Sequence, residues 1–74
     1  MKASIEYCVV WNYYPHAARV AELLDKEFGI ETELIKGGGG IFDVKLNEEL
    51  IYSKRQTGFF PSDDDIREKI KQKK

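Results

Sequence analysis

The pattern that most restricts the fold of this chain is an apolar segment, then an amphipathic helix, then a second alternating segment. Residues 3–10 have few polar interruptions and predict a central β-strand covered on both faces. Apolar side chains recur at helical spacing over residues 15–28, with Pro15 in the first turn and Gly29 where a left-handed residue ends a helix. Residues 30–36 alternate as a second strand. This order predicts a right-handed parallel βαβ unit.

The next segment predicts a β-hairpin. A run of glycines forms a flexible loop after the second strand. Residues 42–46 then alternate between apolar and polar side chains, which is typical of a half-buried strand. Asn47 tolerates a positive φ, so Asn47 and Glu48 predict a tight turn into a short strand at residues 49–53.

The C-terminal segment predicts a loop and a helix. We expect residues 54–60 to be a loop, and Ser62 to cap the helix that follows, with Asp65 completing a capping box three residues later. Ile66 and Ile70 form a narrow apolar stripe that can dock this helix. The predicted order of elements is therefore β-α-β-β-β-α, an α/β fold with two helices.

Composition indicates one small domain formed by residues 1–74. The net charge of −1 provides no basic surface for nucleic acid, so none is expected as a partner. No apolar stretch approaches the roughly 20 residues of a membrane span, so no membrane association is expected. With a single cysteine and no signal-peptide pattern, we expect a cytoplasmic protein without internal disulfides.

The chain offers no pattern for a metal or a phosphate-binding cofactor. One histidine and one cysteine cannot supply the three or four ligands of a zinc site. The aspartates at positions 63–65 face the positive end of the last helix, which explains them without a cation. A strand rather than a helix follows the glycine run, which excludes a P-loop. We expect no metal and no bound cofactor.

Several segments together resemble the selenoprotein W-like family, also called the Rdx group of selenoproteins T, W and H. They are Glu6-Tyr7-Cys8, Gly39-Gly40-Ile41-Phe42-Asp43-Val44, Leu50-Ile51-Tyr52-Ser53-Lys54 and Gly58-Phe59-Phe60-Pro61. The resemblance implies a thioredoxin-like fold, with a four-stranded mixed sheet and two helices. It also implies a small thiol oxidoreductase, often linked to glutathione.

The family's redox motif is Cys-x-x-Cys or Cys-x-x-selenocysteine after the first strand. By position, its first residue is Cys8 and its second is replaced by Trp11. Dithiol cycling within one chain is excluded, because the second thiol must attack the mixed disulfide. Three interpretations of Cys8 remain. The first is a monothiol catalyst whose mixed disulfide is resolved by glutathione, with His16 as the local cation candidate. The second is a buried structural thiol, and the third is a thiol that pairs with another chain.

Large aromatic rings cluster in the two loops expected beside Cys8. They are either a docking surface for a protein partner or the cover of a small core. The rings are Trp11, Tyr13, Tyr14, Phe59 and Phe60. The alternative to a redox protein is therefore a catalytically degenerate thioredoxin-like module that binds a partner through this aromatic rim.

Gly39 and Gly40 complete the candidate site by analogy with thioredoxin-like proteins. The corresponding loop of those proteins approaches the active thiol. These two glycines are expected to leave backbone groups open to a bound peptide or to glutathione. The leading interpretation is a thiol–disulfide redox protein with Cys8 as its catalytic residue. Its partner would be glutathione or a protein thiol.

Overall fold

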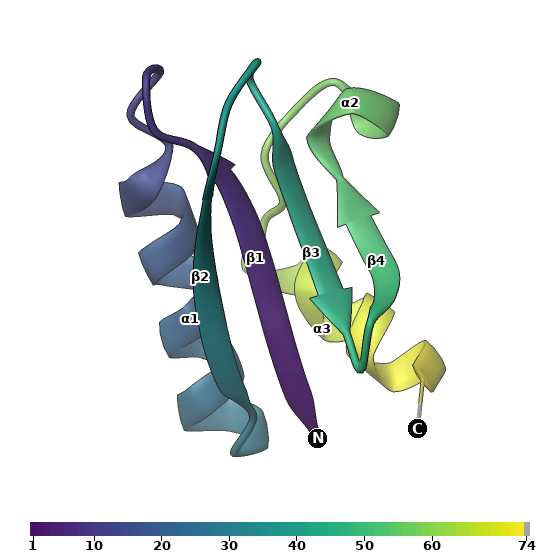
Figure 1. Cartoon of the computed structure of the whole chain (residues 1–74). Helices are drawn as coiled ribbons and strands as arrows, with labels where there is room; N and C mark the ends of the chain where they lie inside the picture. Colours follow the sequence, from purple (N-terminus) through teal and green to yellow (C-terminus); the bar gives the residue numbers. More distant parts are fainter. Residues whose placement is uncertain (74) are drawn as a thin grey trace.

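The computed structural model describes residues 1–73 as one sheet with three helices. The elements are β1 (Lys2–Cys8), α1 (Tyr14–Phe28), β2 (Glu31–Gly37), β3 (Phe42–Leu46), β4 (Glu49–Ser53), α2 (Lys54–Thr57) and α3 (Asp63–Lys73). The sheet order is β2-β1-β3-β4, with β1 and β2 parallel and the other two pairs antiparallel (Figure 1). The predicted α/β fold with a four-stranded mixed sheet is confirmed. Within residues 1–73, no helix has both the length and the apolar character needed to cross a membrane.

Local signals account for most of the elements. Gly29 ends α1 in the left-handed region, with φ of 63°, and Asn47 and Glu48 turn β3 into β4 with φ of 51° and 70°. At the start of α3 the Ser62 N–H donates to Asp65 Oδ2 at 3.0 Å, and the Asp65 N–H donates to Ser62 Oγ at 3.1 Å. This is the predicted capping box.

The segment predicted as a loop at 54–60 contains the short helix α2. Thr57 closes it by donating its hydroxyl to the Ser53 carbonyl at 3.2 Å. Gly58 then ends it with φ of 87°, and its N–H donates to the Lys54 carbonyl at 2.7 Å. A single turn is too short for hydrophobic periodicity to reveal, because that signal needs a window of about 11 residues or more. Residues 1–73 therefore form three helices rather than the two that were predicted.

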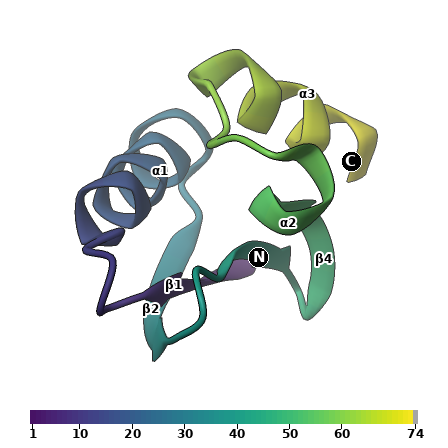
Figure 2. The ribbon, with the colours of Figure 1, turned by 90° about the horizontal axis from the view of Figure 1, so that it is seen from above.

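Both long helices lie on the same face of the sheet (Figure 2). The large side chains that are fully buried beneath them are Phe42, Ile5, Leu24, Ile66, Ile70 and Val44. On the other face no described helix covers the strands, and Ser4 and Glu6 of β1 are half-buried there. The prediction that the first strand is covered on both faces was wrong. Its polar residues mark the uncovered face, as strand alternation requires.

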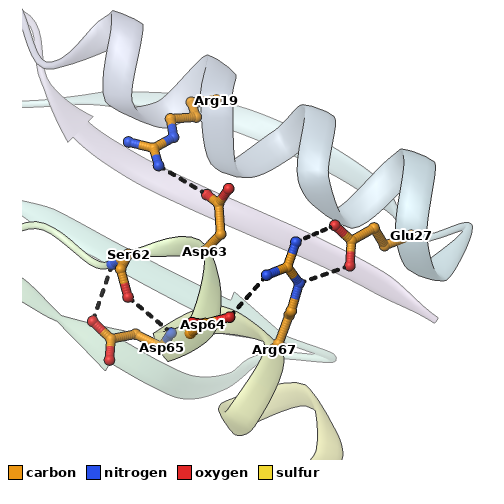
Figure 3. A network of polar contacts seen from close by, with 7 residues as sticks. All are labelled: Arg19, Glu27, Ser62, Asp63, Asp64, Asp65 and Arg67. Carbon is orange, nitrogen blue, oxygen red and sulfur yellow. Dashed lines mark hydrogen bonds and ion pairs between the residues drawn. The ribbon is translucent and has the colours of Figure 1, made fainter.

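The two long helices are joined by ion pairs as well as by the core (Figure 3). Arg67 of α3 donates two hydrogen bonds to the Glu27 carboxylate of α1, at 2.8 and 2.6 Å, and a third to Asp64 at 2.8 Å. Arg19 of α1 reaches Asp63 at 3.1 Å. The hydrogen bonds from Arg67 hold the pKa of Glu27 below its ordinary value. These contacts fix the position of α3 against α1.

Candidate thiol site

Cys8 is the last residue of β1 and its side chain is fully buried. Its N–H donates to the Ile41 carbonyl at 2.9 Å, and its Cα lies opposite Gly37 of β2. The backbone of Cys8 therefore has a neighbour on each side, Ile41 on one and Gly37 on the other. The glycine loop that follows β2 reaches this end of the sheet (Figure 1).

A tight turn follows Cys8 and places a backbone donor on its sulfur. The Trp11 N–H donates to Cys8 Sγ at 3.4 Å. The Asn12 N–H donates to the Val9 carbonyl and the Tyr13 N–H to the Cys8 carbonyl, each at 3.0 Å. Asn12 takes a left-handed φ of 56°, which asparagine tolerates well. This turn carries the chain from β1 directly into the first turn of α1.

The turn also corrects the predicted length of the first strand, which was expected to reach Val10. Val9 instead donates its N–H to the Gly37 carbonyl at 3.2 Å, and the turn then leaves the sheet. The side chains of Val9 and Val10 are 47% and 84% exposed. Their apolar character suggested a strand, but the turn-forming Asn12, two residues after Val10, was the better signal.

Gly40 lies directly beneath the indole ring of Trp11. A Cβ added to Gly40 would lie only 2.6 Å from Cζ3 of that ring, and Gly40 has a left-handed φ of 76°. Gly40 is buried although the ring above it is 61% exposed. Beside it, Arg55 of α2 donates from Nη2 to the Gly39 carbonyl at 3.4 Å. Trp11, Gly39 and Gly40 therefore come together at the Cys8 end of the sheet.

The predicted aromatic group divides into an exposed part and a core part. Tyr13 and Phe60 are half-buried and meet edge to face at 4.7 Å, and Phe60 continues to the buried Phe42 at 5.2 Å. Trp11 and Phe59 are each 61% exposed. Trp11 touches the group through Tyr13, at 6.0 Å between ring centroids. Tyr13 and Phe60 therefore serve the core, while Trp11 and Phe59 face solvent.

The loop that carries Phe59 is fixed by hydrogen bonds. The Tyr52 hydroxyl donates to the Phe59 carbonyl at 2.6 Å. The Thr57 hydroxyl lies 3.0 Å from the same carbonyl and 2.9 Å from the Tyr52 hydroxyl. Phe59 is therefore an exposed ring on a well-anchored backbone.

Three basic residues near this end, His16, Lys54 and Arg55, contact rings or backbone. The His16 ring stacks on Phe60 at 3.7 Å with an angle of 6° between the planes. Lys54 Nζ lies 5.2 Å from the centre of Phe60 and 5.7 Å from that of Tyr13, within cation–π range. Sequence reasoning missed these contacts, because they join segments that are far apart in the chain.

A separate hollow on the uncovered face of the sheet contains none of the predicted site residues. Ser4, Glu33 and Lys45 are among the side chains that line it. Within residues 1–73, no group of three or more histidine, cysteine, aspartate or glutamate side chains is arranged to hold a metal ion.

The model of the Rdx family matches residues 2–72. The chain belongs to the Rdx family. This Rdx protein is similar to Migration and invasion enhancer 1 of Mus musculus, with 34% identity over 68 residues, and to that of Bos taurus, with 32%. Each match covers 90% of this chain and 59% of the relative. The chain therefore spans about three fifths of the length of these curated relatives.

Two solved structures share the fold of this Rdx protein. One is a protein of Bordetella parapertussis, with a TM-score of 0.93 and 25% identity, covering 99% of this chain and 96% of that chain. The other is a selenoprotein W-related protein of Vibrio cholerae, with a TM-score of 0.90 and 24% identity over 96% and 92% of the two chains. The resemblance to the selenoprotein W-like family is confirmed, and so is the thioredoxin-like fold that it implied. The family is a redox family.

Proposed function

We propose that this Rdx protein is a thiol–disulfide redox protein in which Cys8 is the single nucleophilic thiol and glutathione is the co-substrate. The hydrogen bond from the Trp11 N–H to Cys8 Sγ supports this most directly. It aims a donor at the sulfur from the second position of the family's redox motif. Such a bond is stronger when the acceptor is an anion, and the thiolate is the form that attacks a disulfide.

The reaction has to proceed without a second thiol in the chain. The Cys8 thiolate attacks one sulfur of a substrate disulfide, that S–S bond breaks, and the other sulfur leaves as a thiolate. A glutathione thiolate then attacks the mixed disulfide, releases the second substrate thiol and leaves glutathione bound to Cys8. A second glutathione thiolate frees Cys8 as oxidised glutathione departs. The net change is one disulfide reduced and two glutathione thiols oxidised.

Access to the sulfur is the main requirement on this mechanism. Cys8 is fully buried, whereas Val10 and Trp11 in the turn beside it are 84% and 61% exposed. An attack on a disulfide therefore requires the 9–12 turn to move away from the sulfur. Turns with mostly exposed side chains open locally at a lower free energy than the core.

Oxidised glutathione tests the proposal directly. In the folded protein, wild type should gain one glutathione by intact-mass measurement, and added reduced glutathione should remove it again. Cys8→Ala should gain none, because it lacks the sulfur at little change in volume. Phe59→Ala is the matched control, because it keeps Cys8 and removes a ring that is as exposed as that of Trp11. It should behave as wild type. An adduct that forms only when urea unfolds the protein would contradict the proposal.

The burial of Cys8 together with the exposure of Trp11 and Phe59 favours a second candidate function. This is a thioredoxin-like module that binds a protein partner through those two rings, with Cys8 as a packed side chain. Exposed aromatic anchors are typical of binding hot spots. Under this alternative, Cys8→Ala keeps partner binding, whereas Trp11→Ala and Phe59→Ala each weaken it. A loss of binding in Cys8→Ala with the fold intact would exclude the module.

A further inference from the structure

Two loops meet the end of β1 at which Cys8 is buried. In the alternation of β1, Cys8 takes the side of Ser4 and Glu6, opposite the side that packs against the helices. Gly37, its partner on β2, has no side chain to contribute to the cover. The turn at residues 9–12 and the glycine loop at 38–41 both bond to Cys8 and therefore form part of its barrier to solvent.

One residue joins these two loops. The backbone of Trp11 donates to Cys8 Sγ at 3.4 Å, and its indole ring lies on Gly40. The hypothetical Cβ of Gly40 would lie 2.6, 3.0 and 3.2 Å from three atoms of the ring, so the fit depends on the missing side chain. The ring is 61% exposed, yet it fills the space that a side chain at position 40 would take.

We propose that Trp11 is a positioning residue for the thiol chemistry of Cys8. Its ring, seated on Gly40, holds the 9–12 turn closed over the sulfur and keeps the Trp11 N–H directed at it. This inference rests on the proposed function, since it describes how that thiol becomes reactive. Reagents reach Cys8 after the ring leaves Gly40, and a mixed disulfide at Cys8 keeps the ring displaced.

Alkylation by iodoacetamide in the folded protein measures the opening of the turn. Trp11→Ala keeps the N–H and removes the ring, so the rate should rise about tenfold, which corresponds to about 1.4 kcal/mol of opening free energy. Trp11→Phe should restore part of the protection, because a smaller ring can still lie on Gly40. Leu50→Ala, which removes an exposed apolar side chain from β4, is the control and should alkylate at the wild-type rate. Equal rates for wild type and Trp11→Ala would overturn the inference.

Global unfolding is separated from turn opening by a urea titration of each variant. The faster alkylation of Trp11→Ala should persist in water, where unfolding is negligible. A rate that instead follows the fraction of unfolded protein across the titration would overturn the inference.

Fluorescence supplies a readout that a purely structural role would not change. Trp11 is the only tryptophan of the chain, so the intrinsic emission reports on this ring alone. Addition of oxidised glutathione should shift the emission of wild type to longer wavelength as the ring enters water, with no shift in Cys8→Ala. An adduct formed without any shift would overturn the inference while leaving the proposed function intact. Fast alkylation of Trp11→Ala without any glutathione adduct, in wild type or variant, would instead refute the proposed function.

Discussion

The α1–α3 layer and the Cys8 end of the sheet are held in different ways. In the helical layer Leu24, Ile66 and Ile70 are fully buried, and Arg67 joins the two helices from the surface. At the Cys8 end, the side chains of Val10 and Trp11 are largely exposed. Local backbone hydrogen bonds and the contact between Trp11 and Gly40 hold the turn. We therefore expect the helical layer to contribute more to stability, and the exposed turn beside the thiol to open more easily.

Leu24→Ala should have the largest effect on this comparison. The Leu24 side chain of α1 is fully buried, and removing it leaves a cavity. The free energy of unfolding should therefore fall by about 2–5 kcal/mol. Phe59→Ala at the other end removes a ring that is 61% exposed and should change it by less than about 0.5 kcal/mol. Urea unfolding followed by circular dichroism measures both.

A gentler variant keeps that comparison measurable if Leu24→Ala fails to fold. Ile66→Val removes one methylene from another fully buried position and should cost about 0.5–1.5 kcal/mol. A loss from Phe59→Ala as large as that from Ile66→Val would show that the Cys8 end contributes more to stability than its exposure indicates.

Ser62→Ala should have an intermediate effect on the helical layer. The hydroxyl accepts a hydrogen bond from the Asp65 N–H at 3.1 Å, and losing such a cap typically costs about 1 kcal/mol. The same urea titration measures it, with Ser62→Asn as the control that retains a capping side chain. The alkylation rate of Cys8 should remain at the wild-type value, because the hydrogen bonds of the capping box join Ser62 and Asp65 to each other. A faster rate would mean that the two regions are coupled.

Acid should weaken the contact between α1 and α3. The resulting loss of stability should be the smallest of the predicted effects. The hydrogen bonds from Arg67 hold the pKa of Glu27 below the ordinary value of 4.5. The Glu27 carboxylate therefore binds a proton more weakly in the folded state than in the unfolded state. Its stabilisation is complete above pH 4.5 and is lost as the pH falls through the lowered value in the folded protein. Glu27→Gln should therefore lose less stability than wild type between pH 5 and pH 3 in low salt. Parallel curves for the two proteins would show that the pair does not contribute.

Much of the fold follows from local signals in the sequence. Gly29, the Asn47-Glu48 turn and the Ser62 capping box each set a boundary through the conformation or the hydrogen bonds of a few residues. The uncovered face of the sheet was missed, because an apolar run was given more weight than Ser4 and Glu6 within it. The single turn of α2 was missed because it is shorter than any periodic signal.

The candidate site was less accessible to sequence reasoning. The position of Cys8 at the end of a strand followed from the pattern, and Trp11 followed from the spacing of the family's motif. The contact between Trp11 and Gly40 joins residues from two separate loops, and nothing in either loop alone specifies it. The burial of Cys8 likewise depends on how those loops meet. Tertiary contacts of this kind require the folded structure.

The position of β2 at one side of the sheet has a consequence for how copies of the protein meet. One edge of β2 pairs with β1, and within residues 1–73 no strand lies along its other edge. Such an edge can recruit a strand from a neighbouring molecule and begin aggregation. Glu31 and Glu33 are exposed along it, so two copies approaching through this edge bring carboxylates together. The repulsion between them disfavours pairing of two copies through this edge.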